Sequence, residues 1–391
     1  MTLDEQEMPA ENENRFVRLF LYLSFILVGI VNTFLGPTLP FLYDKWHLND
    51  VQAGYLLAAQ SLGGLLGALT ASFLFAKLSA RRIFFVGYVF IVVSLLGLNG
   101  GVWQIGLFSS FLSGIALGLI IPTTTLIVSQ TAGENRAAAI NILNFFWALG
   151  AVSSPLLFFA LSSPSQLNYL FIAIAFVAAC FSAFSFKLKN IRIASSEEKT
   201  AASGREKLTV LFSAWLFVVT VFLQIGVEAS LGGWLPTFAK RITSSDWWML
   251  VPTFYWTGFL LSRLLSAFYL RLIGEKPAIL FGLLLALVGQ LFFLLTIEIN
   301  IAAAGAFLVG FGTAPIFPTT IAVLSGKFEK KAPELLSYMF LLAGLSGMTF
   351  SWLIGYAASL TGELKFALFI PLICSLILFA LHLSLLKKRR A

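Results

Sequence analysis

The chain has 391 residues, of which 59% are hydrophobic and only 11% are charged, and its formal net charge is +8. Soluble globular proteins carry about 25% charged residues, so this composition excludes a soluble two-domain enzyme, and it also excludes a disordered chain, a collagen and a coiled coil. A mean hydropathy of +0.91 indicates a protein whose main solvent is lipid.

Twelve apolar runs follow one another along the chain. A helix needs roughly 20 apolar residues to cross the hydrocarbon core of a bilayer. The runs cover approximately residues 16–42, 51–75, 83–98, 103–128, 137–161, 169–186, 208–235, 247–270, 277–297, 301–324, 334–360 and 366–386. The sequence therefore predicts an all-α polytopic membrane protein with twelve transmembrane helices.

One polar tract, at 190–207, divides the runs six and six. We therefore expect a disordered acidic tail at 1–14, an N-terminal six-helix bundle at 15–189, a cytoplasmic linker at 190–207 and a C-terminal six-helix bundle at 208–391. The tail MTLDEQEMPAENEN is acidic, whereas a cleavable signal peptide begins with a basic region, so no cleavable signal is expected.

The distribution of basic residues predicts that both termini are cytoplasmic. With this orientation, all but five of the 26 Lys and Arg residues lie in inner segments, as the positive-inside rule requires. The five exceptions are Lys45, Lys240, Arg241, Lys365 and Arg263. The basic surplus then needs no nucleic-acid partner, and the short loops favour a monomer in a bacterial inner membrane.

Four basic residues lie in equivalent inner loops and are candidates for gating. They are Lys77, Arg81, Arg82 and Arg271. We expect them at the cytoplasmic surface in every conformational state.

The two halves of the chain are copies of each other. GPTLP at 36–40 matches GGWLP at 232–236, and PTTTLIVS at 122–129 matches PTTIAVLS at 318–325, both at a shift of 196. In the second span of each half, Gly63 corresponds to Gly258 at a shift of 195. Repeats with an even number of spans share one orientation, so an axis along the membrane normal is expected to relate them, as in transporters.

Two ionisable residues, Glu228 and Arg263, lie deep within predicted spans. Such residues are costly in hydrocarbon and are functional candidates by default. Gln224 lies one helical turn before Glu228 on the same face, and Asn32 is the repeat partner of Glu228. We interpret Glu228, Gln224 and Asn32 as lining a central water-filled cavity, with a protonated acid and an interhelical Asn as the structural alternatives.

Arg263 lies on the cytoplasmic side of the middle of its span, and Glu228 lies on the outer side of its own. A combined offset of about nine residues corresponds to roughly 14 Å of depth, which argues against a direct salt bridge. Arg263 is a candidate for an inner gate, for a substrate contact or for a structural role.

Other polar residues in the spans are weaker candidates for substrate binding. Asn141 and Asn144 are spaced i, i+3 and are followed by Trp147 one turn on, which is typical either of a sugar-binding surface or of interhelical packing. Gln60 and Tyr255 are equivalent at the shift of 195. Trp234 is expected either to close the cavity from outside or to anchor its helix at the membrane interface.

The sequence lacks the motifs of membrane enzymes and pumps. It contains no P-loop, no HExxH, no Cys/His metal spacing and no nucleophile elbow, and its only histidines are His47 and His382. No enzymatic activity, cofactor or metal is therefore expected.

These features resemble the major facilitator superfamily, and several stretches are similar to its fucose and hexose:proton symporter branch. The stretches are GPTLPFL at 36–42, RAAAINILNFFWALGAVSSP at 136–155, QIGVEASLGGWLPTF at 224–238, WTGFLLSRLLSAFYLRLIGEK at 256–276 and GFGTAPIFPTTIAVLSGKF at 310–328. The resemblance implies twelve spans in two six-helix bundles. Two departures stand out: the loop signature at 72–82 lacks its Asp, and neither the first nor the fourth span carries the acid common in proton-linked sugar carriers.

The sequence thus predicts a secondary active transporter that moves a small polar organic solute by rocker-switch alternating access. A sugar or sugar derivative is the favoured substrate, and a coupled proton or other cation would be carried by Glu228 unless transport is uncoupled. The alternatives are an exporter of amphipathic compounds, favoured by the 40 Phe residues, and a non-transporting membrane receptor or scaffold on the same fold.

Overall fold

The computed structural model describes residues 11–75, 77–132, 135–161, 166–188, 214–243, 246–328 and 331–387, and within these ranges it contains helices and no strand. The elements are α1 (Glu11–Thr33), α2 (Leu35–Trp46), α3 (Asp50–Leu74), α4 (Ala80–Leu98), α5 (Trp103–Thr131), α6 (Arg136–Phe159), α7 (Leu167–Ser185), α9 (Trp215–Ile242), the 3-10 helix η3 (Asp246–Met249), α10 (Leu250–Ile273), α11 (Glu275–Leu295), α12 (Ile299–Thr313), α13 (Ile316–Phe328), α14 (Ala332–Thr361), α15 (Leu364–Ala367) and α16 (Phe369–Lys387).

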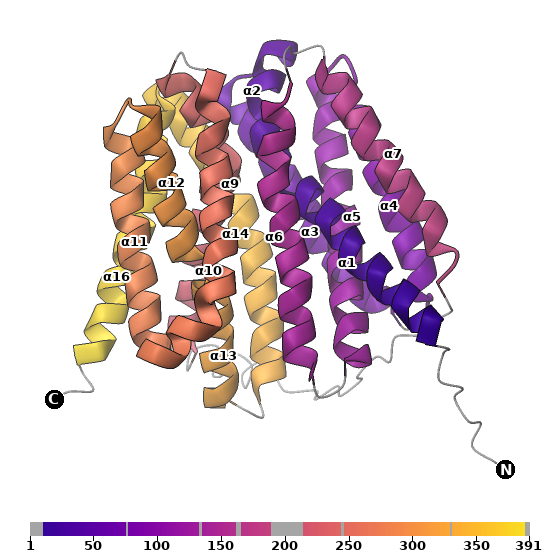
Figure 1. Cartoon of the computed structure of the whole chain (residues 1–391). Helices are drawn as coiled ribbons and strands as arrows, with labels where there is room; N and C mark the ends of the chain where they lie inside the picture. Colours follow the sequence, from indigo (N-terminus) through magenta and orange to yellow (C-terminus); the bar gives the residue numbers. More distant parts are fainter. Residues whose placement is uncertain are drawn as a thin grey trace, which may run out of the picture.

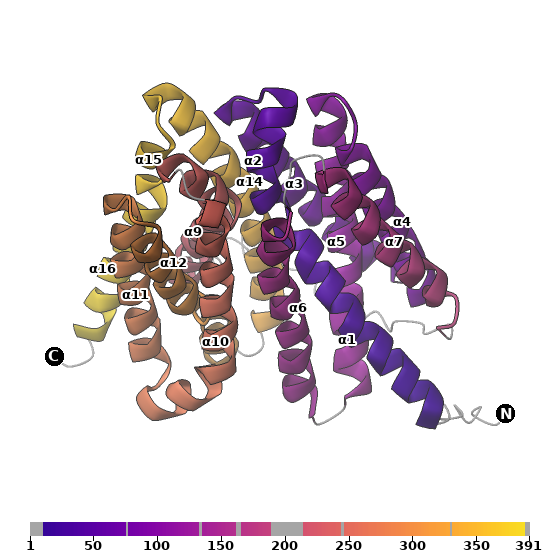
Figure 2. The same ribbon diagram turned by 45° about the horizontal axis from the view of Figure 1, so that its top comes forward.

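The helices lie side by side in two groups (Figure 1). Helices α1–α7, the N-half, lie on one side of the molecule, and α9–α16, the C-half, lie on the other. The view turned by 45° shows the same division (Figure 2). We call the end where α1 begins and α16 ends the terminal end, and the opposite end, which carries α2, the far end.

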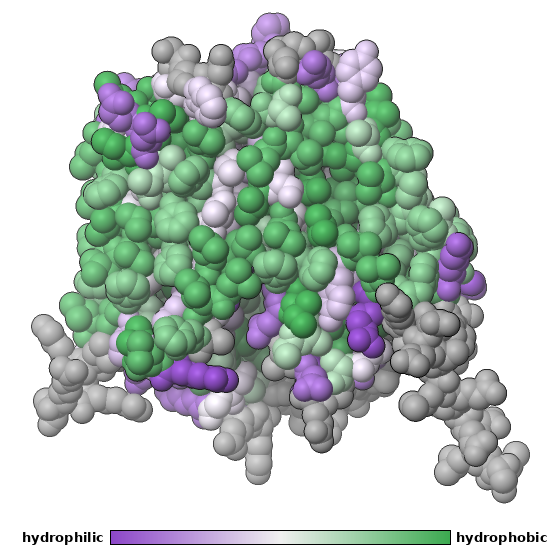
Figure 3. Space-filling view, viewed as in Figure 1, coloured by the Kyte–Doolittle hydropathy of each residue, from purple (hydrophilic) through white to green (hydrophobic). Residues whose placement is uncertain are grey.

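Eleven helical segments in the described ranges are long and apolar enough to cross a membrane. On the face seen in Figure 3, a broad apolar band lies between more hydrophilic ends. The 24-residue α10 is not one of the eleven, because Thr253, Thr257 and Arg263 reduce its hydropathy. A twelfth span at α10 stays a prediction.

Several expected boundaries are corrected by the structure. Helix α1 begins at Glu11, so residues 11–14 of the expected tail are helical, whereas residues 1–10 and the expected linker at 190–207 lie outside the described residues. The seventh span starts at Trp215 and extends to Ile242, beyond its predicted end at residue 235.

The expected span at 301–324 is interrupted. Helix α12 ends at Thr313 and α13 begins at Ile316, and Pro315, which has no backbone N–H, lies between them. Pro318 is the third residue of α13, where its missing N–H would have no intrahelical partner in any case. Pro122, by contrast, lies inside the continuous helix α5.

Glycine contacts repeat between the halves. In the N-half, a Cβ atom on Gly63 of α3 would lie 2.1 Å from the carbonyl oxygen of Phe111 in α5. In the C-half, a Cβ atom on Gly258 of α10 would lie 2.2 Å from the carbonyl oxygen of Phe307 in α12. Only glycine permits such close backbone approach, so the equivalence of Gly63 and Gly258 inferred from the sequence repeat is confirmed.

Candidate functional site

The two halves touch through their backbones at the far end. A Cβ atom on Gly36 of α2 would lie 2.5 Å from the carbonyl oxygen of Gly232 in α9. A Cβ atom on Gly355 of α14 would lie 2.3 Å from the carbonyl oxygen of Asp50 and 3.0 Å from the Cα atom of Gly54 in α3. The space between the halves is therefore closed on this side.

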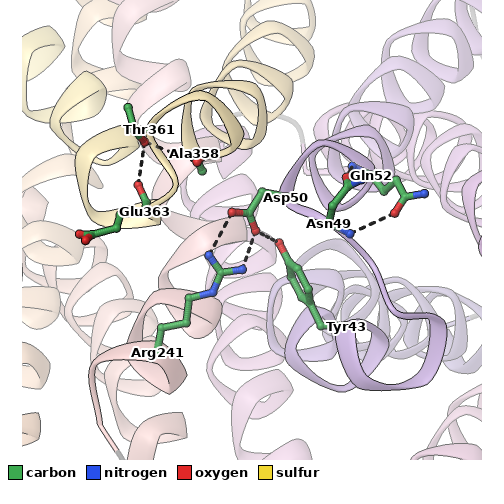
Figure 4. Close-up of polar contacts among 8 residues, drawn as sticks. All are labelled: Tyr43, Asn49, Asp50, Gln52, Arg241, Ala358, Thr361 and Glu363. Carbon is green, nitrogen blue, oxygen red and sulfur yellow. Dashed lines mark hydrogen bonds and ion pairs between the residues drawn. The ribbon is translucent and has the colours of Figure 1, made fainter.

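Charged residues reinforce this closure (Figure 4). The guanidinium of Arg241 in α9 donates hydrogen bonds of 2.5 and 3.1 Å to the two carboxylate oxygens of Asp50 in α3. It also lies 5.0 Å from the ring centroid of Tyr43. Lys240 forms a second ion pair, of 2.9 Å, with Asp44. We call these five residues the far-end latch, and Lys240 also donates to the carbonyl oxygen of Pro40 at 3.3 Å.

Asp50 is held in place from two sides. The Tyr43 hydroxyl donates a hydrogen bond to its carboxylate. Burial and the neighbouring Asp50 carboxylate raise the pKa of Tyr43 above its ordinary value, so the hydroxyl stays protonated and keeps donating. Asp50 is also the first residue of α3, whose start is fixed by a capping box between Asn49 and Gln52.

Aromatic rings connect the halves in the middle of the molecule. The ring of Trp147 in α6 lies 5.8 Å from that of Trp256 and 6.1 Å from that of Phe259, both in α10. The guanidinium carbon of Arg263 lies 4.4 Å from the Phe259 centroid and 5.5 Å from that of Trp147. The sequence analysis missed Trp256 and Phe259, although their spacing of i, i+3 and i+7 with Arg263 places all three on one helix face.

Glu228 of α9 belongs to the same region. Its side chain is half-buried, and its charge interacts electrostatically with Arg263 and Tyr255. In the described residues the two ion pairs are those of the far-end latch, so Glu228 and Arg263 form no ion pair within 4.0 Å. The sequence predicted no direct salt bridge between Glu228 and Arg263 because of their different depths in the membrane, and none is present. Their charges are nevertheless close enough to interact.

Several buried polar atoms in this region make no hydrogen bond of normal geometry with the described residues. They include Nε1 of Trp256 and Nε of Arg263 on α10, and Oγ of Ser230, which lies two residues after Glu228 on α9. An unpaired buried polar group costs about 1–3 kcal/mol, so a set of them around one acid indicates a place for water or a polar ligand.

Asn32 lies at the end of α1, just before the break between α1 and α2. Gly29, one turn before it, packs against the backbone of Trp147, and Gly36, one turn after it, packs against Gly232. The Asn32 side chain between these contacts is nevertheless exposed. Asn32 therefore stays a prediction as a residue of the central site.

Two predicted residues use their amides for helix packing. Nε2 of Gln224, which is 1% exposed, donates to the carbonyl oxygen of Thr313 at 3.3 Å. Nε2 of Gln60 donates to the carbonyl oxygen of Val31 at 3.2 Å and to Ser113 Oγ at 3.4 Å. These hydrogen bonds join neighbouring helices of the same half, and a role for either residue in substrate binding stays a prediction.

The remaining candidates divide between the middle and the far end. Asn144 is half-buried and Asn141 is exposed, and neither amide is hydrogen-bonded to a described residue. Trp234 is 0% exposed and donates from Nε1 to the carbonyl oxygen of Ser351 at 3.1 Å. Trp234 therefore packs under the far-end closure, and the alternative of an interface anchor is wrong.

The four loop candidates lie near the terminal end, where α3 is followed by α4 and α10 by α11 (Figure 1). Lys77 lies between α3 and α4, Arg81 and Arg82 lie in the first turn of α4, and Arg271 lies in the last turn of α10. Lys77, Arg82 and Arg271 are exposed, and Arg81 is half-buried with its guanidinium 5.9 Å from the Phe186 ring centroid. No group of three or more His, Cys, Asp or Glu side chains among the described residues is arranged to hold a metal ion.

Known proteins similar to this chain are transporters. It is 25% identical over 355 residues to the glucose/mannose transporter GlcP of Bacillus subtilis (strain 168), with 87% of each chain covered. It is 22% identical over 324 residues to the uncharacterized MFS-type transporter YfkL of the same organism, with 80% of this chain and 81% of the relative covered.

Solved structures share the fold at low sequence identity. A D-xylose-proton symporter matches with a TM-score of 0.76 and 15% identity, covering 94% of this chain and 97% of that one. The nucleoside transporter NupG matches with a TM-score of 0.74 and 13% identity, covering 96% and 99%. The family model described as Major Facilitator Superfamily matches residues 21–299, which is most of the chain. This chain therefore belongs to the Major Facilitator Superfamily of transporters and is not an enzyme.

Proposed function

We propose that this protein is a secondary active transporter of a monosaccharide-sized polar solute, bound between the halves by Trp147, Trp256, Arg263, Glu228 and Asn32. The observation that carries the proposal is the aromatic contact between α6 and α10, which is surrounded by polar atoms without hydrogen-bond partners. Aromatic faces stack on the C–H faces of a sugar, and the free donors and acceptors suit its hydroxyl groups.

The similarity to GlcP supports this substrate class, because GlcP is a glucose/mannose transporter and the match covers 87% of both chains. The charges of the site also support it. Glu228 and Arg263 offset each other, so the site favours a neutral, hydroxyl-rich solute over a strongly charged one.

Alternating access is proposed as a rocking of two six-helix bundles, 15–189 and 208–391, about this site. The far end is closed by the latch and by glycine contacts, and we propose that the site opens toward the terminal end. Positive-inside asymmetry assigns the terminal end to the cytoplasm of a bacterial inner membrane. In the alternate state the latch separates and the terminal end closes.

We propose that Glu228 binds and releases the coupled proton. It is the acid that lies in the central region, where opening to either side changes its access to water. Uncoupled transport is the alternative, and a flux that is insensitive to a pH gradient would select it.

The test uses the purified full-length protein in proteoliposomes. Counterflow of labelled glucose, mannose and xylose is measured, with unlabelled sugars, amphipathic cations and amino acids as competitors. We expect sugar exchange that other sugars inhibit. Exchange of amphipathic cations without sugar exchange would replace the proposal with an exporter, and the absence of all flux despite ligand binding would favour a receptor.

Trp256→Phe sharpens this test because it keeps an aromatic ring and removes the unpaired N–H. Affinity for the sugar should fall about tenfold, the value of one hydrogen bond to a buried donor. Trp352→Phe, on α14 and stacked on Tyr356, is the matched control and should leave the affinity unchanged.

A further inference from the structure

The C-half carries an apolar groove on its outer surface near the terminal end. Its volume is about 340 Å³, and its lining includes Leu265 and Phe268 of α10, Phe281 and Leu285 of α11, and Phe311 and Pro315 at the end of α12. Phe268 is 70% exposed and Phe281 is 51% exposed, so the walls face outward, away from the central site.

The groove lies where the tenth span is interrupted. Helix α12 ends at Thr313 and α13 begins at Ile316, and Pro315 of this break lines the groove. Just beside it, Gly282 of α11 packs against the backbone of Gly312, where an added Cβ atom would lie 2.4 Å from the carbonyl oxygen. Helices α11 and α12 thus pack closely at Gly282 and Gly312. The break after Thr313 leaves space beside Pro315.

Basic residues stand at the mouth of the groove. Ile273, the last residue of α10, and Ala278, in the first turn of α11, both line the groove. Arg271 lies in the last turn of α10 and Lys276 in the first turn of α11, on the two sides of the connecting residue Gly274. Arg271 is exposed and Lys276 is half-buried. Glu275 is the single acid of this turn, so the mouth carries a net positive charge.

The dimensions match one half of a bilayer. The lining residues of α11 run from Ala278 to Leu285, and the connecting residue Gly274 lies eleven residues before Leu285, or roughly 16 Å along the helix at 1.5 Å per residue. Half of a hydrocarbon core of about 30 Å is roughly 15 Å. A polar ligand would lose its hydration against these walls without compensation, whereas a hydrocarbon chain would not.

We propose that this groove holds one acyl chain of an anionic phospholipid, whose headgroup phosphate is bound by Arg271 and Lys276. The apolar walls select the chain, and the two cations select a negative headgroup over a zwitterionic one. This inference is independent of the transported solute, because the groove lies on the outer surface of the C-half.

The test compares lipids on the full-length protein in neutral detergent, with native mass spectrometry to count bound lipids and thermal unfolding to measure stabilisation. The probes are phosphatidylglycerol and phosphatidylcholine with identical acyl chains, and soluble glycerol 3-phosphate. We expect tighter binding of phosphatidylglycerol, and no competition from glycerol 3-phosphate at equal concentration because it lacks the chain.

Two variants separate the headgroup from the chain. Arg271→Gln with Lys276→Gln should reduce the preference for phosphatidylglycerol about tenfold, and Leu265→Trp, which fills the groove, should weaken both lipids. Lys77→Gln with Arg82→Gln removes the same charge from the equivalent turn of the N-half and is the matched control, with an unchanged preference.

Three outcomes would overturn the proposal. One is an unchanged lipid preference in the double variant, and the second is equal binding of lipid by Leu265→Trp. The third is a dimer in neutral detergent that Leu265→Trp dissociates, which would show that a second copy of the chain covers the groove.

Discussion

The second spans of the two halves, α3 and α10, pack within their own half through equivalent glycine contacts. They differ in the surface that they present to the other half. On α10, the face toward α6 carries Trp256, Phe259 and Arg263. At the repeat shift of 195, the corresponding positions of α3 are Ser61, Gly64 and Ala68. The side chains at these positions of α10 are large, two aromatic and one charged, whereas those of α3 are small.

The difference in size decides how closely the halves approach. On the α3 side, glycines of α14 allow close packing: a Cβ atom on Gly347 would lie 3.3 Å from Oγ of the small residue Ser61, and one on Gly344 would lie 2.9 Å from the Leu65 side chain. On the α10 side, the ring of Trp256 and the guanidinium of Arg263 fill the space toward Trp147. The sequence repeat thus determines the positions of the helices. Differences at a few repeat positions, among them Arg263 and Glu228, place the charged residues of the proposed site in the C-half.

Removing the acid that distinguishes the C-half should have the largest effect. Glu228→Gln keeps the size and a hydrogen-bonding amide, as Asn32 does in the other repeat, but it cannot exchange a proton. We expect a folded protein that still catalyses sugar counterflow and has lost uphill accumulation and its dependence on the pH gradient. Glu298→Gln, at an exposed acid before α12, should behave like wild type, and concentrative uptake by Glu228→Gln with wild-type pH dependence would exclude Glu228 as the proton carrier.

Arg263→Ala converts the C-half position to the residue of the N-half, Ala68, and should weaken substrate binding. The variant removes the charged donor that we propose contacts the substrate, and a hydrogen bond to a charged group contributes about 1.5–3 kcal/mol, which corresponds to roughly a 30-fold increase in Kd. Arg263→Lys should recover only part of this, because an ammonium group does not stack as the planar guanidinium does. Equilibrium binding of labelled sugar measures both, and equal affinity in Arg263→Ala and wild type would remove Arg263 from the site.

Much of the architecture was predictable because it follows from hydropathy and repetition. Apolar run length located the helices, and the shift of 195–196 identified Gly63 and Gly258, whose contacts then match within 0.1 Å. The break at Pro315 was missed because a run of apolar residues continues through it, and hydropathy does not record whether a helix is interrupted.

The site was harder to predict because burial and side-chain direction depend on packing. Gln60 and Gln224 differ from Asn32 in having a backbone carbonyl within reach on a neighbouring helix, which no sequence spacing reveals. In the sequence, Trp256 cannot be distinguished from an aromatic residue that only packs in the core. Its unpaired Nε1 became visible only when the packing around it was known.

The shared scaffold should respond equally in the two halves. Gly63→Ala and Gly258→Ala each place a methyl group about 2 Å from a carbonyl oxygen, and overpacking of this kind costs about 1–3 kcal/mol. We expect both to lower the Tm in detergent by similar amounts, about 2–6 °C. Gly326→Ala, whose Cβ atom would meet nothing within 4 Å, is the control. A clear inequality between Gly63→Ala and Gly258→Ala would show that the two copies do not share one packing scheme.

The far-end latch is where charges of the two halves meet, and its two ion pairs differ in burial. Asp50 has 13% of its side chain exposed and accepts from both Arg241 and Tyr43, whereas Asp44 is 65% exposed and accepts from Lys240 alone. Charged hydrogen bonds that are partly buried contribute about 1.5–3 kcal/mol, and exposed ion pairs about 0–1 kcal/mol. Asp50→Asn should therefore shift the equilibrium toward the far-end-open state by about tenfold or more, and Asp44→Asn by less than about fivefold.

The shift is measured as the rate at which an impermeant maleimide labels a cysteine at position 32 from the far-end side of sealed vesicles, after Cys180 and Cys374 have been replaced by Ser. Labelling reports the fraction of molecules in which the space between the halves opens past the latch, because in the closed state Gly36 and Gly232 block the path. Since the latch contributes in one state only, its loss changes the population of that state and leaves the site itself intact. Equal labelling rates in Asp50→Asn and Asp44→Asn would mean that the glycine contacts close the far end without help from the buried carboxylate.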